Sequence, residues 1–237
     1  INAPIPSAPG RFPSRARAPP AFPSRMTTHL WLAAWALLPS NGTSPCRLLS
    51  LSGGGSWGAF EAGVLQRLIE DRGARLDYDR LLGVSAGAIN AAYIATHPQG
   101  HAGLAEAVAK LRALWARTRT RDVWRVAPLD PVLARSLVST EPLQRMVRTE
   151  LSSRRLLRNI TLGATSLATG KAAVFTEADL PPSLHAVVLA SSAIPVLFPP
   201  VEHRGELLVD GGVVANVLTV HGLASCPPGA PVDLDVV

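Results

Sequence analysis

Two short apolar runs, each ending in glycine and followed by a helical pattern, constrain the fold of this 237-residue chain most strongly. Residues 47–52 predict a strand that ends at Gly53–Gly55, and Ala59–Arg72 predicts an amphipathic helix. Residues 78–84 predict a second strand, and Ala86–Ala95 predicts a helix of small residues. Strands that alternate with helices in this way favour an α/β domain with a largely parallel sheet.

The rest of the chain continues this pattern. The segment 103–158 is predicted to be helical and rich in arginine. A strand begins at 233–237, so we expect the C-terminal part of the domain to be missing from this sequence. Further strands are predicted at 160–166, 171–175 and 206–209, with an apolar stretch at 186–190.

The N-terminal 46 residues differ from the rest. Residues 1–25 are rich in Pro, Ala, Ser and Arg and are predicted to be disordered. The apolar run 30–38 is too short to cross a bilayer as a helix. It fits a signal peptide, a first buried helix or an anchor, which leaves the location of the protein open. We therefore predict a leader over residues 1–46 and one folded domain over residues 47–237.

Charge permits an anionic partner. The net charge is +6, and between Lys110 and Arg158 twelve basic residues face four acidic ones. Trp115 and Trp124 lie in this segment, and arginine with interfacial tryptophan suits an anionic membrane surface. The alternative is a solvated helical face. No nucleic-acid-binding motif accompanies the charge, so we expect no nucleic acid partner.

The two cysteines, Cys46 and Cys226, show no metal-type spacing. We expect two independent residues, which would pair only if the fold brought them together. No metal site is predicted.

The motif with the clearest chemical meaning is Gly83-Val84-Ser85-Ala86-Gly87, which lies where a strand gives way to a helix. A serine on such a tight turn points outward, and Gly83 and Gly87 let the turn pass close to its neighbours. The following helix N-terminus favours negative charge that develops during nucleophilic attack. The sequence predicts Ser85 as a nucleophile.

A second glycine-rich turn spans Gly53–Gly58. Its bare backbone amides predict a site for an oxyanion or a phosphate. The string also fits G-x-G-x-x-G, and Asp77 and Asp79 lie about where a ribose-binding acid would be. A nucleotide-binding oxidoreductase therefore remains an alternative at this point.

The third motif, Asp210-Gly211-Gly212, follows a predicted strand and offers a general base. Loops at strand ends of an open α/β sheet converge on one edge, so all three motifs can meet there. A histidine-containing triad would need His221, since His203 precedes the aspartate. We expect both histidines on surface loops.

Four segments between Leu48 and Val220 resemble the patatin-like phospholipase family. SGGGSWGAFEAGVL (Ser52–Leu65) resembles its oxyanion-hole block, and GVSAGAINAA (Gly83–Ala92) resembles its nucleophile block. SSAIPVLFPPV (Ser191–Val201) and DGGVVANV (Asp210–Val217) resemble two further blocks. The hydroxyls of Ser191, Ser192 and, in the first block, Ser56 are expected to form turns rather than to attack substrate.

The resemblance implies a three-layer α/β fold with a mainly parallel sheet and a lipid acyl hydrolase that needs no cofactor. It implies Ser85 as nucleophile, Asp210 as base and a lipid or phospholipid as substrate. The oxyanion hole would come from the loop of Gly53, Gly54, Gly55, Ser56 and Gly58, with turns at Gly83, Gly87, Gly211 and Gly212.

Two positions depart from the family pattern. Trp57 stands where the family usually has Arg or Lys, which weakens the expectation of phospholipid preference; the indole would contact an acyl chain or simply pack. Leu218 stands where the family tends to have Pro, and we expect this to affect only a local turn. A non-catalytic lipid-binding relative is the remaining alternative.

Overall fold

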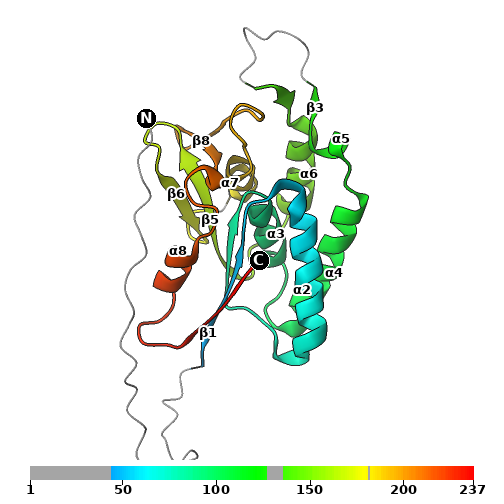
Figure 1. Ribbon diagram of the computed structural model, residues 1–237, viewed down its shortest axis with the longest axis vertical. Coiled ribbons are helices and arrows are strands. Elements are labelled where there is room, and N and C mark those ends of the chain that lie inside the picture. Colours follow the sequence, from blue (N-terminus) through cyan, green and yellow to red (C-terminus); the bar gives the residue numbers. More distant parts are fainter. Residues whose placement is uncertain (1–43, 127–135, 181) are drawn as a thin grey trace, which may run out of the picture. The chain divides into compact units, whose positions relative to one another are not determined.

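The computed structural model describes residues 44–126, 136–180 and 182–237 (Figure 1). The predicted leader lies outside these residues except for its last three, 44–46. The remaining residues form an α/β domain built on one central sheet.

The central sheet is parallel in its middle and antiparallel at one side. Its strand order is β7-β8-β5-β2-β1-β9, and β6 also pairs with β5. The pairs β9–β1, β1–β2 and β2–β5 are parallel, whereas β6 and β8 run antiparallel to β5. The strands are β1 (Cys46–Leu51), β2 (Arg80–Val84), β5 (Asn159–Ser166), β6 (Ala172–Thr176), β7 (Val201–His203), β8 (Glu206–Asp210) and β9 (Val232–Val236), with a separate pair of β3 (Arg125–Val126) and β4 (Val138–Ser139).

Helices cover both faces of the sheet, and Figure 1 shows α8 on the face opposite α2, α3 and α4. The two helices that follow the glycine-rich motifs agree closely with the sequence prediction. The α-helices are α2 (Gly58–Arg72), α3 (Ala86–Ala95), α4 (His101–Arg117), α5 (Thr120–Val123), α6 (Glu141–Leu151), α7 (Leu184–Ser191) and α8 (Thr219–Ala224), and the 3₁₀ turns are η1 (Gly55–Trp57), η2 (Gly73–Arg75) and η3 (Gly211–Val213).

Alternation along β2 explains the two covered faces. Leu81 packs into the large core formed with α2, α3, α4 and α7. Leu82 and Val84 point to the other face, where they pack against Leu218 at the start of α8. We had expected Leu218 to affect only a local turn. Its side chain instead completes the second core.

Two sequence predictions need correction. The segment 103–158 is not one helical stretch, because β3 and β4 separate α5 from α6. The predicted strand 206–209 belongs to a hairpin rather than to a parallel unit. Arg204 and Gly205 between β7 and β8 both have positive φ, 52° and 79°, which is the backbone that a tight hairpin turn requires.

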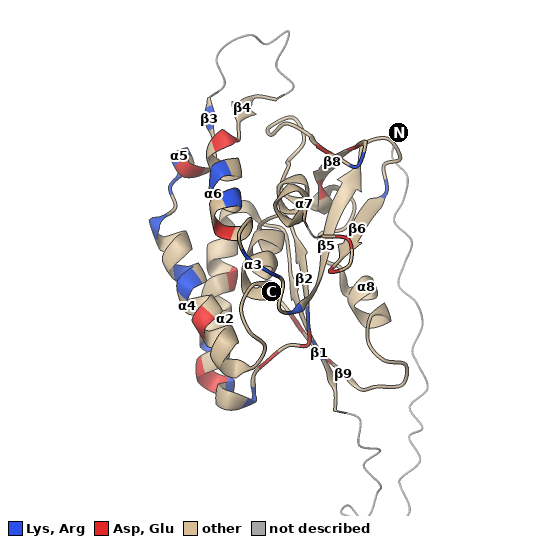
Figure 2. Cartoon of the chain, turned by 180° about the vertical axis from the view of Figure 1, so that it is seen from behind, with Lys and Arg blue, Asp and Glu red and all other residues tan. Residues whose placement is uncertain are grey.

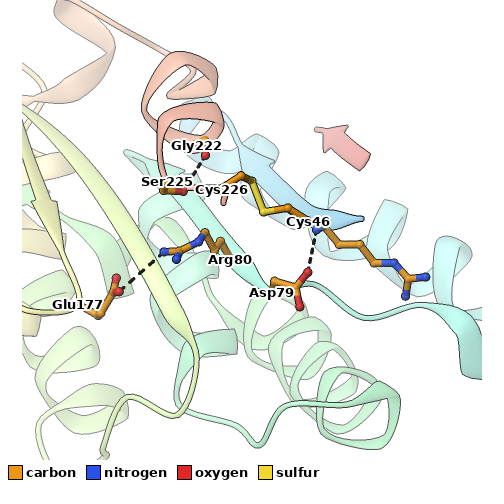
Figure 3. The surroundings of a disulfide bond; sticks show 8 residues. Cys46, Asp79, Arg80, Glu177, Gly222, Ser225 and Cys226 are labelled. Carbon is orange, nitrogen blue, oxygen red and sulfur yellow. Dashed lines mark hydrogen bonds and ion pairs between the residues drawn. A yellow bond between two sulfur atoms is a disulfide. The ribbon is translucent and has the colours of Figure 1, made fainter. Parts of the chain in front are cut away.

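The two cysteines form a disulfide, contrary to our expectation of independent residues (Figure 3). Their Cα atoms lie 5.9 Å apart although 180 residues separate them in sequence. The pairing arises because β9 lies beside β1, so that Cys46 faces Val232, and the segment after α8 returns to the start of β1. Spacing alone could not reveal this contact.

Removing the disulfide should lower the free energy of unfolding by about 2–4 kcal/mol, because the bond closes a very long loop in the unfolded chain. Urea denaturation of the wild type with and without a thiol reductant measures this. The Cys46→Ser/Cys226→Ser variant is the control and should not respond to reductant. Equal midpoints for the oxidised and reduced wild type would contradict the prediction.

Candidate active site

Ser85 occupies a sharp turn between β2 and α3. Its φ of 54° and ψ of −121° are unusual for a residue with a side chain. A Cβ at Gly83 would lie 2.6 Å from the carbonyl oxygen of Gly87, and a Cβ at Gly87 would lie 2.2 Å from that of Leu51. The turn can therefore form only with glycine on both sides of Ser85.

Two buried hydroxyls from the end of α7 hold this turn. Ser191 Oγ accepts a hydrogen bond from the Ser85 amide at 2.8 Å and donates to the Gly163 carbonyl at 2.6 Å. Ser192 Oγ lies 3.1 Å from the Ser85 carbonyl oxygen. Ser191 and Ser192 thus fix the turn that carries Ser85. From the sequence we had expected only that their hydroxyls would form turns.

The structure brings Ser85 and Asp210 together. Ser85 Oγ donates a hydrogen bond to Asp210 Oδ2 at 2.6 Å, and both side chains are buried. The Gly212 amide donates to the other carboxylate oxygen at 2.8 Å. The carboxylate is therefore held in place from both of its oxygens.

Asp210 does not reach this position as the sequence suggested, from the carboxyl end of a parallel strand. It ends β8, which runs antiparallel to β5 and places Asp210 opposite Ala164. The preceding residue of β5, Gly163, is level with Val84 on β2. Asp210 therefore arrives beside Ser85 from the opposite direction, and its amide is fixed by a 2.9 Å hydrogen bond to the Ala193 carbonyl.

Burial raises the pKa of the Asp210 carboxyl above its ordinary value. Hydrogen bonds from Ser85 and Gly212 oppose this shift without cancelling it. A carboxylate with a raised pKa is a stronger base.

The glycine-rich loop lies against Ser85, and a Cβ at Gly53 would come within 3.0 Å of the Ser85 Cβ. The Gly53 amide donates to Asn216 Oδ1 at 3.1 Å, and the Gly58 amide bonds to carbonyls within the loop. In the described part of the chain, no acceptor is recorded for the amides of Gly54, Gly55 and Ser56. These three amides are the ones that remain available to an anion.

Asn216 is a site residue that the sequence analysis missed. Its side-chain oxygen accepts from the Gly53 amide, and its side-chain nitrogen donates to the Gly53 carbonyl at 3.0 Å, so that both backbone polar groups of Gly53 are held. It lies in the DGGVVANV block, only six residues after Asp210. That block therefore supplies both the carboxylate and the group that positions the glycine-rich loop.

A buried polar cluster supports the loop from below. Asn90 Nδ2 donates to the Gly58 carbonyl at 2.9 Å and to Glu61 Oε2 at 2.7 Å, and the Trp115 indole donates to Asn90 Oδ1 at 2.8 Å. Burial raises the pKa of the Glu61 carboxyl from its ordinary value of 4.5 to about 7. Gly58 itself packs on Trp115, since a Cβ there would lie 2.5 Å from the indole.

A cavity of about 560 Å³ opens beside Ser85. Gly55 and Ser56 line it next to the hydroxyl, and its remaining walls are mainly apolar. These walls include Ile89, Trp115, Trp124, Met146, Leu197 and Phe198. A cavity of this kind suits a flexible hydrocarbon chain whose polar end reaches Ser85.

The structure does not support a ribose-binding role for Asp77 and Asp79, on which the nucleotide-binding alternative depended. Asp77 and Asp79 precede β2, so they lie at the edge of the sheet opposite the glycine-rich loop, which follows parallel β1. Asp77 binds Arg158 at 2.6 Å, and Asp79 accepts from the Arg47 amide at 2.8 Å. Neither carboxylate can reach a ribose held at Gly53–Gly58.

The histidines do not complete a triad. Asp210 is bonded to Ser85 and Gly212, with no histidine recorded at its carboxylate among the described residues. His203 is buried in β7 against Phe175, which corrects the expectation of a surface loop. His221 is exposed on α8.

Fold and site together define an α/β protein in which a tight strand–helix turn presents a buried serine to a carboxylate from an antiparallel strand. The chain belongs to the patatin-like phospholipase family, whose family model matches residues 49–221. This match confirms the family resemblance and the predicted fold class, with the antiparallel side strands as the one refinement.

Curated relatives are longer than this chain. It is 27% identical over 216 residues to a cGAMP-activated phospholipase of Escherichia coli (strain TW11681). This alignment covers 80% of this chain and 58% of that protein. The chain is 33% identical over 184 residues to an uncharacterised NTE family protein of Mycobacterium tuberculosis, with 76% and 46% covered. Among solved structures, VipD from Legionella pneumophila is similar at a TM-score of 0.45 and 16% identity, with 82% of this chain and 50% of that chain covered. The chain thus spans about half the length of these proteins.

The Glu61→Gln variant should become more stable than the wild type as the pH rises. The buried site favours the protonated form of Glu61. The stability of the wild type that depends on this form is fully present below pH 4.5 and is lost as the pH rises through about 7. Glutamine resembles the protonated acid and keeps its polar contacts at all these pH values. Above pH 7 the variant should lead by roughly 3 kcal/mol, because one pKa unit corresponds to about 1.4 kcal/mol.

Urea denaturation at pH 4.5, 6 and 8 measures the difference between the two proteins. Glu70→Gln makes the same substitution at an exposed carboxylate on the same helix and serves as the matched control. A constant difference across this pH range would contradict the assignment of Glu61.

Proposed function

We propose that this protein is a lipid acyl hydrolase that uses Ser85 as nucleophile and Asp210 as general base. The observation that carries the proposal is the 2.6 Å hydrogen bond from Ser85 Oγ to Asp210 Oδ2 at the wall of an apolar cavity. Membership of the patatin-like phospholipase family supports an ester bond of a lipid as the target.

The first half of the reaction forms an acyl-enzyme. Asp210 accepts the Ser85 proton as Oγ attacks the acyl carbonyl carbon, and the carbonyl oxygen becomes an oxyanion. The amides of Gly54, Gly55 and Ser56 belong to the loop that lies against Ser85 and have no recorded acceptor in the described chain, and they stabilise this oxyanion. The tetrahedral intermediate then collapses, and the leaving alcohol takes the proton from Asp210.

The second half returns the enzyme to its starting state. A water molecule gives a proton to Asp210 and attacks the acyl carbon, and the bond to Ser85 Oγ breaks. Ser85 regains its proton from Asp210, and the fatty acid leaves. Both halves use only groups of this chain, water and substrate.

A carboxylate can serve as the base here because its surroundings strengthen it. Burial raises the pKa of Asp210, and the Gly212 amide fixes the carboxylate so that the other oxygen faces Ser85. The strained Ser85 backbone presents the hydroxyl without rearrangement. Orientation therefore compensates for the low basicity of an ordinary aspartate.

Ser85→Ala should reduce hydrolysis of a soluble short-chain ester at least 10³-fold, and Asp210→Asn should reduce it at least 10²-fold, because each removes a group that forms or breaks a bond. Ser152→Ala changes an exposed serine outside the site and should leave the rate unchanged. Release of p-nitrophenol from its butyrate ester measures all three. Wild-type rates in Ser85→Ala would refute the proposal, and an inactive wild type that still binds lipid would favour a non-catalytic relative.

The value of kcat/KM should fall on the acid side with an apparent pKa above 3.8, the ordinary value for aspartate, because the base must be ionised and burial raises its pKa. Activity is thus expected to be complete above this pKa and to fall as the pH drops through it. A pH–rate profile on the same soluble ester measures the limb. An acid limb at or below 3.8 would contradict the assigned environment of Asp210.

A further inference from the structure

Four apolar side chains stand exposed around the mouth of the cavity. Trp57 is 68% exposed, Phe60 60%, Ile194 37% and Val196 74%. We call these four residues the apolar rim. The rings of Trp57 and Phe60 pack edge to face at 6.1 Å, so this part of the rim is ordered rather than a set of loose side chains.

The rim borders the cavity on two sides. Trp57 and Phe60 flank Ala59, which lines the cavity together with Ser56. Val196 stands between Ile194 and Leu197, which line it from the segment after α7. The rim thus borders the cavity that contains Ser85 from two segments, one after β1 and one after α7.

Val196 gives an independent indication that the rim has a function. Its φ is 70°, a conformation that a β-branched residue adopts only at a cost in energy. The Leu137 amide donates to the Val196 carbonyl at 3.1 Å, and the Val138 amide donates to that of Leu197 at 3.2 Å, so the backbone is held while the side chain faces solvent. Glycine would suit this backbone better, and an exposed valine gains nothing from packing.

The basic segment 110–158 presents less unpaired charge than its composition suggested. Figure 2 shows acidic residues at both ends of α6 with basic residues between them, and on α4 Glu106 pairs with Lys110. Trp115 and Trp124 are half-buried in the cavity wall rather than exposed. In the part of this segment that the structure describes, six basic residues form ion pairs: Lys110, Arg117, Arg125, Arg145, Arg154 and Arg158. Arg158 is also buried.

Charge near the rim still favours an anionic surface. Arg119 is exposed and lines the cavity, and Arg121, two residues further along, is also exposed. Exposed tryptophan and phenylalanine beside arginine match the interfacial region of a lipid layer, where rings enter the acyl boundary and cations meet headgroups. Among the described residues, no helix is long and apolar enough to cross a bilayer.

We propose that the apolar rim inserts into the surface of an anionic lipid layer and places the cavity mouth over the acyl chains. This rests on the proposed function, because a substrate that lives in a lipid layer must pass from it into the cavity. The contact is peripheral, with Trp57, Phe60 and Val196 supplying apolar area and Arg119 supplying charge.

The test uses the full chain with Phe60→Ser and Val196→Gly, separately and combined. Co-sedimentation with phosphatidylcholine:phosphatidylglycerol (7:3) vesicles measures binding, and p-nitrophenyl butyrate hydrolysis measures the site without a membrane. The combined variant should bind vesicles at least tenfold more weakly and hydrolyse the soluble ester at the wild-type rate. Val196→Gly should unfold at the same or a higher urea concentration than the wild type, because glycine relieves the strained backbone.

Val220→Ser is the matched control, since Val220 is an equally exposed valine on α8, on the other face of the sheet. It should leave vesicle binding unchanged. Pure phosphatidylcholine vesicles should bind the wild type less tightly than the 7:3 mixture at low salt.

Undiminished vesicle binding by the combined variant would overturn the proposal. So would an equal loss of vesicle binding and soluble-ester hydrolysis, which would place the rim inside the catalytic site. A change from dimer to monomer in analytical ultracentrifugation, with vesicle binding retained, would assign the rim to a second copy of this chain instead. Vesicle binding by an enzyme that hydrolyses no ester would refute the proposed function and leave the rim proposal standing.

Discussion

The hydrogen bond between Ser85 and Asp210 depends on strand pairing across β2, β5 and β8. Ser85 follows the end of β2, and Asp210 ends β8, with β5 between them. Gly163 on β5 is level with the end of β2, and a Cβ at Gly211 would lie 2.4 Å from the Gly163 carbonyl oxygen. The contact therefore requires a glycine at position 211, directly after β8. A shift of one residue in the register of either strand pair would separate the two side chains.

The loops around this pair are coupled to it by a small number of polar contacts. Ser191 fixes the Ser85 turn, and the next residues lead through Ala193, whose carbonyl holds Asp210, to the strained Val196. On the other side, Asn216 joins the segment after Asp210 to Gly53. One consequence is that the glycine-rich loop, the serine turn and the carboxylate help to position each other, in addition to the support that Asn90 gives the loop.

Much of this could be predicted from the sequence because the motifs are local. The turn at Ser85 and the loop at Gly53–Gly58 have strand-before and helix-after patterns that also fix α2 and α3. What could not be predicted depends on distant pairing. The sequence shows neither that β8 enters antiparallel nor that Cys226 meets Cys46, since both follow from the strand order. Asn216 was missed because a single exposed asparagine after a glycine turn has no pattern of its own.

Covalent labelling identifies the nucleophile without reference to any substrate. A fluorophosphonate reacts with an activated serine, and mass spectrometry locates the adduct. Cleavage after Arg80 and Lys110 gives the tryptic peptide 81–110, in which Ser85 is the only serine. We expect the adduct on this peptide, and we expect it to form much more slowly in Asp210→Asn. If the adduct formed on a different serine, and formed as fast as ester hydrolysis was lost, Ser85 would not be the nucleophile.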